Sequence, residues 1–280
     1  MENEYILGRN YIYGENGAEK DARRGYEYYL EGYKKGDMKC AYGLGICYDN
    51  GHHVEKDKET ALKYFDEAFK QLYSEAKHGD KYCQFMIACY YEFGDMGQKK
   101  DASKAAEWYE RSAKQGYAPA QRNFGRICHA GKNFTKAVEW FAKAAEQGDA
   151  NAQSSLGICY ASGKGVTQSD AKAVEWFTKA AERGFAEAQY YLAVSYRDGR
   201  ALQKSEEKAV EWFIKAAGQG YAKAQYNLGV CYNEGIVVQE NCGKAMEWLN
   251  KAAAQGNEQA IEMLKKFKKN KYGTWEYAAN

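Results

Sequence analysis

The strongest constraint in this sequence is an internal repeat, which returns along nearly the whole chain. Each copy ends in a glycine, and the intervals between successive closing glycines are 43, 37, 32, 36, 36 and 36 residues. The closing glycines are Gly36, Gly79, Gly116, Gly148, Gly184, Gly220 and Gly256. A unit this short cannot bury its apolar faces by itself, so the copies must stack on one another.

Each copy has the pattern of a hairpin of two helices. In residues 173–189, AVEWFTKAAERGFAEAQ, Ala173, Trp176 and Phe177 begin an apolar stripe with helical spacing. Gly184 then supplies the left-handed residue that often ends a helix. The next helix carries a small residue nine positions after the closing glycine, which lets its partner helix approach closely. These small residues are Gly45, Ala88, Gly125, Gly157, Ala193 and Gly229.

We therefore predict an all-α fold in which residues 1–270 form one stack and residues 271–280 form a C-terminal tail. Tyr11 and Tyr28 fit the template, so the first repeat is expected to be a diverged copy. The predicted repeats cover residues 1–35, 36–78, 79–115, 116–147, 148–183, 184–219 and 220–255, with a capping helix at 256–270.

Two departures from the template predict local structure. Repeat two has seven extra residues after Tyr64, or about two helical turns, so we expect that helix end to project by roughly 10 Å. After the last closing glycine, two template positions become Lys265 and Lys268. Leu264 and Phe267 still offer an apolar face, so we expect a helix with a polar back that closes the stack.

The repeat also resembles known families. The spacing of Leu156, Gly157, Tyr160, Ala173 and Phe177 resembles the tetratricopeptide pattern. With its mostly 36-residue unit and the series AxAQxxLGxxY, EW and KAA, the chain more closely resembles the Sel-one-like repeat (SLR) family over its full length. The resemblance implies a right-handed α/α superhelical solenoid of about seven helix-turn-helix repeats. It also implies an adaptor or scaffold rather than an enzyme.

Composition excludes several other classes of protein. The net charge is +2, which argues against a surface for nucleic acid spread over the whole chain. No apolar run approaches the ~20 residues of a membrane span. The first residues, MENEYILGRN, lack the apolar core of a secretory signal, so we expect a cytoplasmic protein and leave signal-less export open. The eight cysteines contain no C-x-x-C pair and are expected to be reduced.

A Glu-Trp pair recurs in the second helix and could indicate a tuned acid or a sugar-stacking site. Each Glu lies four residues before a Lys or Arg, a spacing that stabilises a helix by ~0.2–0.5 kcal/mol. Each Trp shares the apolar stripe, so we expect it to be a core residue and predict a structural role for the pair. The pairs are Glu107-Trp108, Glu139-Trp140, Glu175-Trp176, Glu211-Trp212 and Glu247-Trp248.

Patterns typical of catalytic and metal sites are weak. S-x-x-K occurs at Ser74, Ser169 and Ser205, but the last two precede a helix where an N-cap is expected, and no S-D-N or K-T-G accompanies them. The four histidines, His52, His53, His78 and His129, lie without convergent ligands. We expect no catalytic residues, no metal and no cofactor. The basic run Lys265–Lys271 is expected to be a solvated face of the cap.

Partner binding is expected on the first helix of each repeat. Positions 3, 6, 10 and 13 after the closing glycine form a second stripe, opposite the core, whose occupants vary between repeats; Glu187 is one of them. In tetratricopeptide-like solenoids this helix lines the concave surface, which holds extended segments. Aromatic and Arg side chains are the usual binding hot spots. The predicted contact residues are Tyr42, Tyr82, Phe85, Arg122, Arg126, Tyr190, Arg197, Tyr226 and Asn227.

Three functions remain open from the sequence. We favour a non-catalytic adaptor for a protein or extended peptide, with an acidic stretch received by Arg122 and Arg126. The alternatives are a Ser-dependent hydrolase or penicillin-binding protein, and a self-assembling structural array. We expect a monomer or a weak oligomer.

Overall fold

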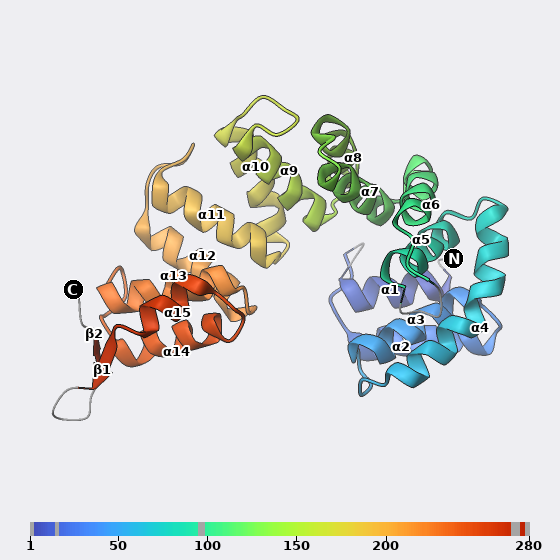
Figure 1. Ribbon diagram of the computed structural model, residues 1–280, viewed down its shortest axis with the longest axis horizontal. Coiled ribbons are helices and arrows are strands. Elements are labelled where there is room, and N and C mark those ends of the chain that lie inside the picture. Colours follow the sequence, from blue (N-terminus) through green and yellow to red (C-terminus); the bar gives the residue numbers. More distant parts are fainter. Residues whose placement is uncertain (1–2, 15–16, 95–98, 270–274, 278–280) are drawn as a thin grey trace. The chain divides into compact units, whose positions relative to one another are not determined.

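The computed structural model is built almost entirely of helices, coloured from blue to red along the chain in Figure 1. It describes residues 3–14, 17–94, 99–269 and 275–277. The helices are α1 (Glu4–Tyr13), α2 (Ala22–Lys34), α3 (Met38–Asn50), α4 (Lys58–Lys77), α5 (Lys81–Phe93), α6 (Ala102–Lys114), α7 (Ala118–Ala130), α8 (Phe134–Glu146), α9 (Ala150–Ser162), α10 (Asp170–Glu182), α11 (Ala186–Asp198), α12 (Glu206–Gly218), α13 (Ala222–Glu234), α14 (Cys242–Ala253) and α15 (Glu258–Leu264). Two short strands follow, β1 (Phe267–Lys269) and β2 (Trp275–Tyr277). Among the described residues, no helix has the length and apolar character needed to cross a membrane.

The chain divides into two compact units, Met1–Ile127 (unit 1) and Cys128–Asn280 (unit 2), and α7 crosses the boundary between them. In unit 1 the hairpins are α1/α2, α3/α4 and α5/α6. In unit 2, α8 packs on α9, and the hairpins α9/α10, α11/α12 and α13/α14 follow. Each hairpin also packs on the next within its unit. The predicted repeat of two helices is therefore confirmed.

The small residues of the first helix lie where the two helices of a hairpin meet. A Cβ atom added to Gly157 would lie 2.6 Å from a ring carbon of Phe177, so only a residue without a side chain fits there. Gly184, after α10, has φ 83°, the left-handed conformation that the closing position requires. The predicted close approach and the predicted helix ends are both present.

The recurring Glu-Trp pairs are structural. Each Trp ring is covered by the cation three residues later, at 3.9 to 4.6 Å from the ring centroid. The carboxylate of Glu175 pairs with the ammonium group of Lys179 at 2.6 Å, as the i,i+4 spacing predicts. Trp108 and Trp140 are buried, whereas Trp176, Trp212 and Trp248 are half-buried. Trp176, Trp212 and Trp248 are thus only partly enclosed by the core, and a lysine side chain covers one face of each ring. This corrects the prediction that all five tryptophans are core residues.

Buried glutamines tie the ends of the helices together. The side-chain amide of Gln189 donates to the carbonyl oxygen of Ala181 at 3.2 Å and accepts from Gln219 at 2.8 Å. The same link joins Gln84 to Gln115 and Gln225 to Gln255. In repeat five Arg183 stands where the donor glutamine would be, and the buried Oε1 of Gln153 has no hydrogen-bond partner among the described residues.

The extra turns of repeat two do not project. Helix α4 has 20 residues and α6 has 13, so the insertion lengthens the helix as expected. Its Leu72 and Ala76 are buried, and the ring of Tyr73 lies 5.9 Å from that of Trp108 in α6. The prediction of a protruding end is wrong, because the apolar residues of the insertion keep the helical phase and pack on the following hairpin.

The C-terminal cap combines a short helix with a hairpin of strands. Helix α15 ends at Leu264, and β1 pairs antiparallel with β2, placing Phe267 opposite Tyr277. Phe267 is buried in the cluster that contains Leu249 of α14. The predicted helix over 256–270 is therefore wrong beyond Leu264, since Lys268 occupies the position that would continue the apolar stripe. Asn270, Lys271 and most of the predicted tail lie outside the described residues.

Candidate partner-binding surface

The first-helix stripe of unit 1 is occupied by the protein's own aromatic side chains. Tyr42 is only 5% exposed and packs its ring against Phe65 and Tyr90 at 5.5 and 5.7 Å. Tyr82 in α5 is half-buried, and its ring lies 6.1 Å from that of the buried Tyr5 in α1. The expectation that Tyr42 lines an accessible wall is therefore wrong, because the aromatic cluster of unit 1 encloses it.

Helix α1 reaches across unit 1 to the start of α7. The guanidinium carbon of Arg9 lies 5.0 Å from the centroid of the Tyr117 ring, and Arg9 also donates a hydrogen bond to the Tyr117 hydroxyl. Phe85 is half-buried between Tyr117 and Tyr109, at ring distances of 5.2 and 5.7 Å. In a simple stack each repeat contacts only its neighbours. A contact from repeat one to the start of repeat four therefore shows that this face of unit 1 is closed by its own N-terminal helix.

The predicted basic pair in α7 has an acidic neighbour. Arg126 forms an ion pair with Glu92 of α5, and Glu92 also accepts a hydrogen bond from the Tyr109 hydroxyl at 2.6 Å. The side chain of Arg122 is half-buried and donates to Asn123 at 3.3 Å. Glu92 occupies the stripe position thirteen residues after its closing glycine, so it offsets part of the positive charge there.

In unit 2 the structure brings three predicted residues together on α11 and α13. The Nη1 atom of Arg197 donates to Oδ1 of Asn227 at 3.0 Å, and its Nε donates to Asp198 at 2.8 Å. The ring of Tyr190 lies 5.3 Å from that of Tyr221, and burial raises the pKa of Tyr190. Arg197 is exposed, while Tyr190 and Asn227 are half-buried. This face is thus ordered by bonds between repeats and accessible at the same time.

The remaining predicted contact residue, Tyr226, lies on α13 beside Asn227. It is half-buried and packs against the apolar cluster formed by α14, α15 and the C-terminal hairpin. Its ring is therefore shared between this face and the core of the last repeat.

The serines of the S-x-x-K motifs before α10 and α12 cap those helices. The hydroxyl of Ser169 accepts from the backbone N–H of Lys172 at 3.3 Å, and that of Ser205 accepts from Lys208 at 3.2 Å. These are the N-cap bonds expected from the sequence. The third motif serine, Ser74, is exposed on α4.

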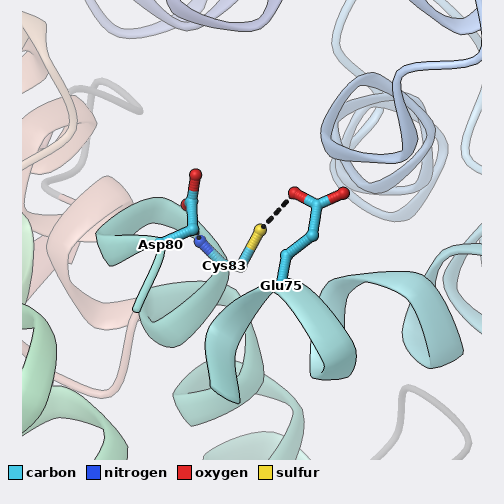
Figure 2. Close-up of side chains that lie close together, drawn as sticks. All are labelled: Glu75, Asp80 and Cys83. Atoms are coloured by element: carbon cyan, nitrogen blue, oxygen red, sulfur yellow. Dashed lines mark hydrogen bonds between the residues drawn. The ribbon is translucent and has the colours of Figure 1, made fainter. Parts of the chain in front are cut away.

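Figure 2 shows one group of potential metal ligands, Glu75 of α4 with Asp80 and Cys83 at the start of α5. Their ligand atoms lie within 4.8 Å of one another. The Nζ atom of Lys39 lies 2.6 Å from Glu75 and 3.5 Å from Asp80. The side-chain ammonium group of Lys39 therefore already supplies a positive charge to these two carboxylates. Burial raises the pKa of the Cys83 thiol, which donates to Glu75 at 3.3 Å. The group serves as an ion-paired tie between α3, α4 and α5.

The sequence did not single out this tie, the glutamine links or the position of Tyr221. The glutamines had a visible signal, because Gln recurs both in AxAQ and before the closing glycine. Lys39 lies three residues after a closing glycine, which is a stripe position, but its partner Glu75 stands where repeat five has the buried Ala180, so the template gives no sign of an ion pair there. Tyr221 follows a closing glycine, a position that the stripe did not include.

Solved structures with this architecture are similar to the chain. A protective antigen of uropathogenic Escherichia coli with an SLR fold is 32% identical, with a TM-score of 0.60 over 92% of this chain and 54% of that one. A Sel1 repeat protein from Oxalobacter formigenes is 27% identical, with a TM-score of 0.64 over 90% of this chain and 97% of that one. The chain thus spans about half the length of the first and nearly all of the second.

Sequence comparison points the same way. Chitin synthase regulatory factor 3 of Schizosaccharomyces pombe is 30% identical over 110 residues, which is 39% of this chain but only 11% of that protein. The Sel1 repeat family profile matches residues 4–37, 39–71, 81–117, 118–149, 150–185, 186–221 and 222–257. These seven matches cover most of the chain and coincide with its helical hairpins, and the chain therefore belongs to the Sel1 repeat family.

Proposed function

We propose that this chain is a non-catalytic adaptor that holds a segment of another protein on one face of unit 2. This docking face is formed by Tyr190 and Arg197 of α11 and Asn227 of α13. Sel1 repeat proteins generally serve as scaffolds for protein interactions. The observation that carries the proposal is the bond between Arg197 of α11 and Asn227 of α13, beside the half-buried ring of Tyr190.

This arrangement has the properties of a binding hot spot. Tyr and Arg are enriched among the residues that carry most of the binding energy in protein interfaces. Here their side chains are held in place by packing and hydrogen bonds, so less conformational entropy is lost when a partner binds. The corresponding face of unit 1 is closed by Tyr5 and Arg9, which favours unit 2 as the docking face.

Partner capture from native extract, followed by affinity measurement with the captured protein, tests the proposal. Combining Tyr190→Ala with Arg197→Glu should weaken binding at least tenfold, because hot-spot truncations cost about 2 kcal/mol or more. A matched control is Glu211→Ala on the opposite helix of the same repeat, an exposed residue outside the face. Binding that is unchanged in the double variant, while its thermal melting matches that of the control, would rule out this face.

The basic pair of α7 forms a second arm of the same experiment. Arg122→Glu combined with Arg126→Glu should abolish capture of a partner that docks an acidic stretch there. Thermal melting is measured beside it, because the change also breaks the ion pair between Arg126 and Glu92. Retention of every partner would show that Arg122 and Arg126, which belong to unit 1, receive no acidic stretch, and the docking face of unit 2 is judged separately by the Tyr190→Ala, Arg197→Glu variant.

A further inference from the structure

The chain contains two equivalent aromatic triads, one in each unit. The first member lies six residues after a closing glycine, the second directly follows the Trp of the same repeat, and the third directly follows the next closing glycine. The triads are Phe85, Tyr109 and Tyr117 in unit 1, and Tyr190, Phe213 and Tyr221 in unit 2. The ring distances agree closely, at 5.7 and 5.2 Å in unit 1 and at 6.0 and 5.3 Å in unit 2.

The triad of unit 1 already holds an arginine. The guanidinium group of Arg9 lies over the ring of Tyr117 and donates to its hydroxyl. A cation over a tyrosine ring is attracted by the negative face of the ring, by ~0.5–1 kcal/mol when exposed and more when desolvated. The chain itself therefore shows which ligand chemistry this arrangement of rings accepts.

In unit 2 no cation covers Tyr221 among the residues that the structure describes. The ring is half-buried and packs against Tyr190, and within that described part of the chain it has no cationic neighbour comparable to Arg9. Arg197, on the same face, donates to Asp198 and Asn227, so its charge is already paired.

A carboxylate stands beside this triad. Glu187 lies three and four residues before Tyr190 and Tyr191 in α11, so the three side chains share one side of the helix. Tyr190 carries this side of α11 to the third ring of the triad, because its ring lies 5.3 Å from that of Tyr221. Burial raises the pKa of Tyr191 and of Tyr221, and the negative charge of Glu187 acts in the same direction.

Glu187 is tied to its surroundings by a neutral hydrogen bond. It is half-buried and accepts from the hydroxyl of Ser154 at 3.0 Å. Among the described residues, no Lys, Arg or His forms an ion pair with it. A partly desolvated carboxylate among tyrosine rings favours a cation, and its charge adds to the attraction that the rings exert.

We infer that Glu187, Tyr190, Tyr191 and Tyr221 bind an arginine side chain presented by a basic segment of a partner protein. This inference rests on the proposed function and names the chemistry of the partner. The guanidinium group stacks on the Tyr221 ring and donates to the Glu187 carboxylate. Arginine fits better than lysine, because its planar fork can stack and donate at the same time.

The experiment uses the full chain and a small probe, N-acetyl-Ala-Arg-Ala-amide, followed by NMR of the tyrosine rings. The matched probe carries citrulline, which has nearly the same shape as arginine but no charge. We expect saturable shifts at Tyr190 and Tyr221 with the arginine peptide, and binding at least about tenfold weaker with citrulline. Glu187→Gln should weaken the arginine peptide about three- to tenfold, whereas the exposed Glu211→Gln should leave its affinity unchanged.

Three results would overturn the arginine site: equal binding of the two peptides, unchanged affinity in Glu187→Gln, or no saturable shift at these rings. The proposed function is judged by a different measurement, which is partner capture by the Tyr190→Ala, Arg197→Glu variant. Loss of capture with equal binding of the two peptides would keep the docking face and reject its arginine specificity. Unchanged capture would reject the docking face itself.

Discussion

Replacing Arg183 by Gln should stabilise unit 2, because it supplies the one amide that repeat five lacks. In repeats three, six and seven, the glutamine before the closing glycine donates to a buried glutamine at 2.8 to 2.9 Å. Arg183 occupies this position after α10, and its guanidinium group lies against Gly148 instead. The Oε1 atom of Gln153, in a residue that is only 4% exposed, is left without a partner in the described part of the chain.

The size of the effect depends on whether the Oε1 atom of Gln153 has a hydrogen-bond partner. A net hydrogen bond contributes about 0.5–1.5 kcal/mol, and a buried acceptor without a partner costs about 1–3 kcal/mol. We therefore expect Arg183→Gln to raise the free energy of unfolding by about 1–2 kcal/mol. The converse change, Gln219→Arg, removes the hydrogen bond to Gln189 and should lower the free energy of unfolding by about 1–3 kcal/mol.

Thermal and urea unfolding, followed by circular dichroism, measure both variants. A change of about 1 kcal/mol shifts the melting temperature of a chain this large by roughly 2–4 °C. Hydrogen exchange of the α9 and α10 amides shows whether the gain is local, because repeat arrays can unfold in parts. If Arg183→Gln leaves stability unchanged and Gln219→Arg is also neutral, the glutamine links do not hold the repeats together and the reasoning is wrong.

Further predictions concern packing and pH. Gly157→Ala should destabilise the chain by about 1–3 kcal/mol, because its Cβ would lie 2.6 Å from the Phe177 ring; Gly218→Ala, which faces open space, should instead raise the melting temperature slightly. The pKa of Glu75 is lowered: burial acts to raise it, but hydrogen bonds led by that from Lys39 outweigh burial. The ionised Glu75 carboxylate stabilises the fold at pH values above the ordinary pKa of Glu. This stabilisation is lost as the pH falls through the lowered pKa of Glu75 in the folded protein. Glu75→Gln should therefore destabilise the chain at pH 7, and the difference from the wild type should shrink below about pH 4 in urea unfolding. A difference that stays constant with pH would mean that the Lys39 pair contributes nothing.

The sequence predicted the helical hairpins well because each depends on local spacing. Apolar residues at three and four positions, a cap at the start and a glycine at the end act within one copy, so a single copy was enough to recognise them. The small residue at Gly157 was also correctly interpreted, since glycine weakens the interior of a helix and is expected there mainly where a neighbouring backbone or ring comes close.

Errors arose where the outcome depends on contacts between repeats. Tyr42 was assigned to an open wall from its helical position, but its exposure depends on Tyr90 and on the path of α1, neither of which the template encodes. The insertion of repeat two was expected to project, yet Leu72 is buried and the ring of Tyr73 packs against Trp108 of the following hairpin.

The sequence by itself determined that the chain is a stack of about seven helical hairpins, because hydrophobic period and glycine position are properties of neighbouring residues. Only the tertiary structure decided which stripe positions are buried, which cations are already paired, and where one amide is missing. Those outcomes depend on side chains from different repeats, such as Arg9 with Tyr117, 108 residues apart, meeting at a common surface. Spacing along one helix carries no information about contacts between repeats, so the candidate binding face could be located only from the packed structure.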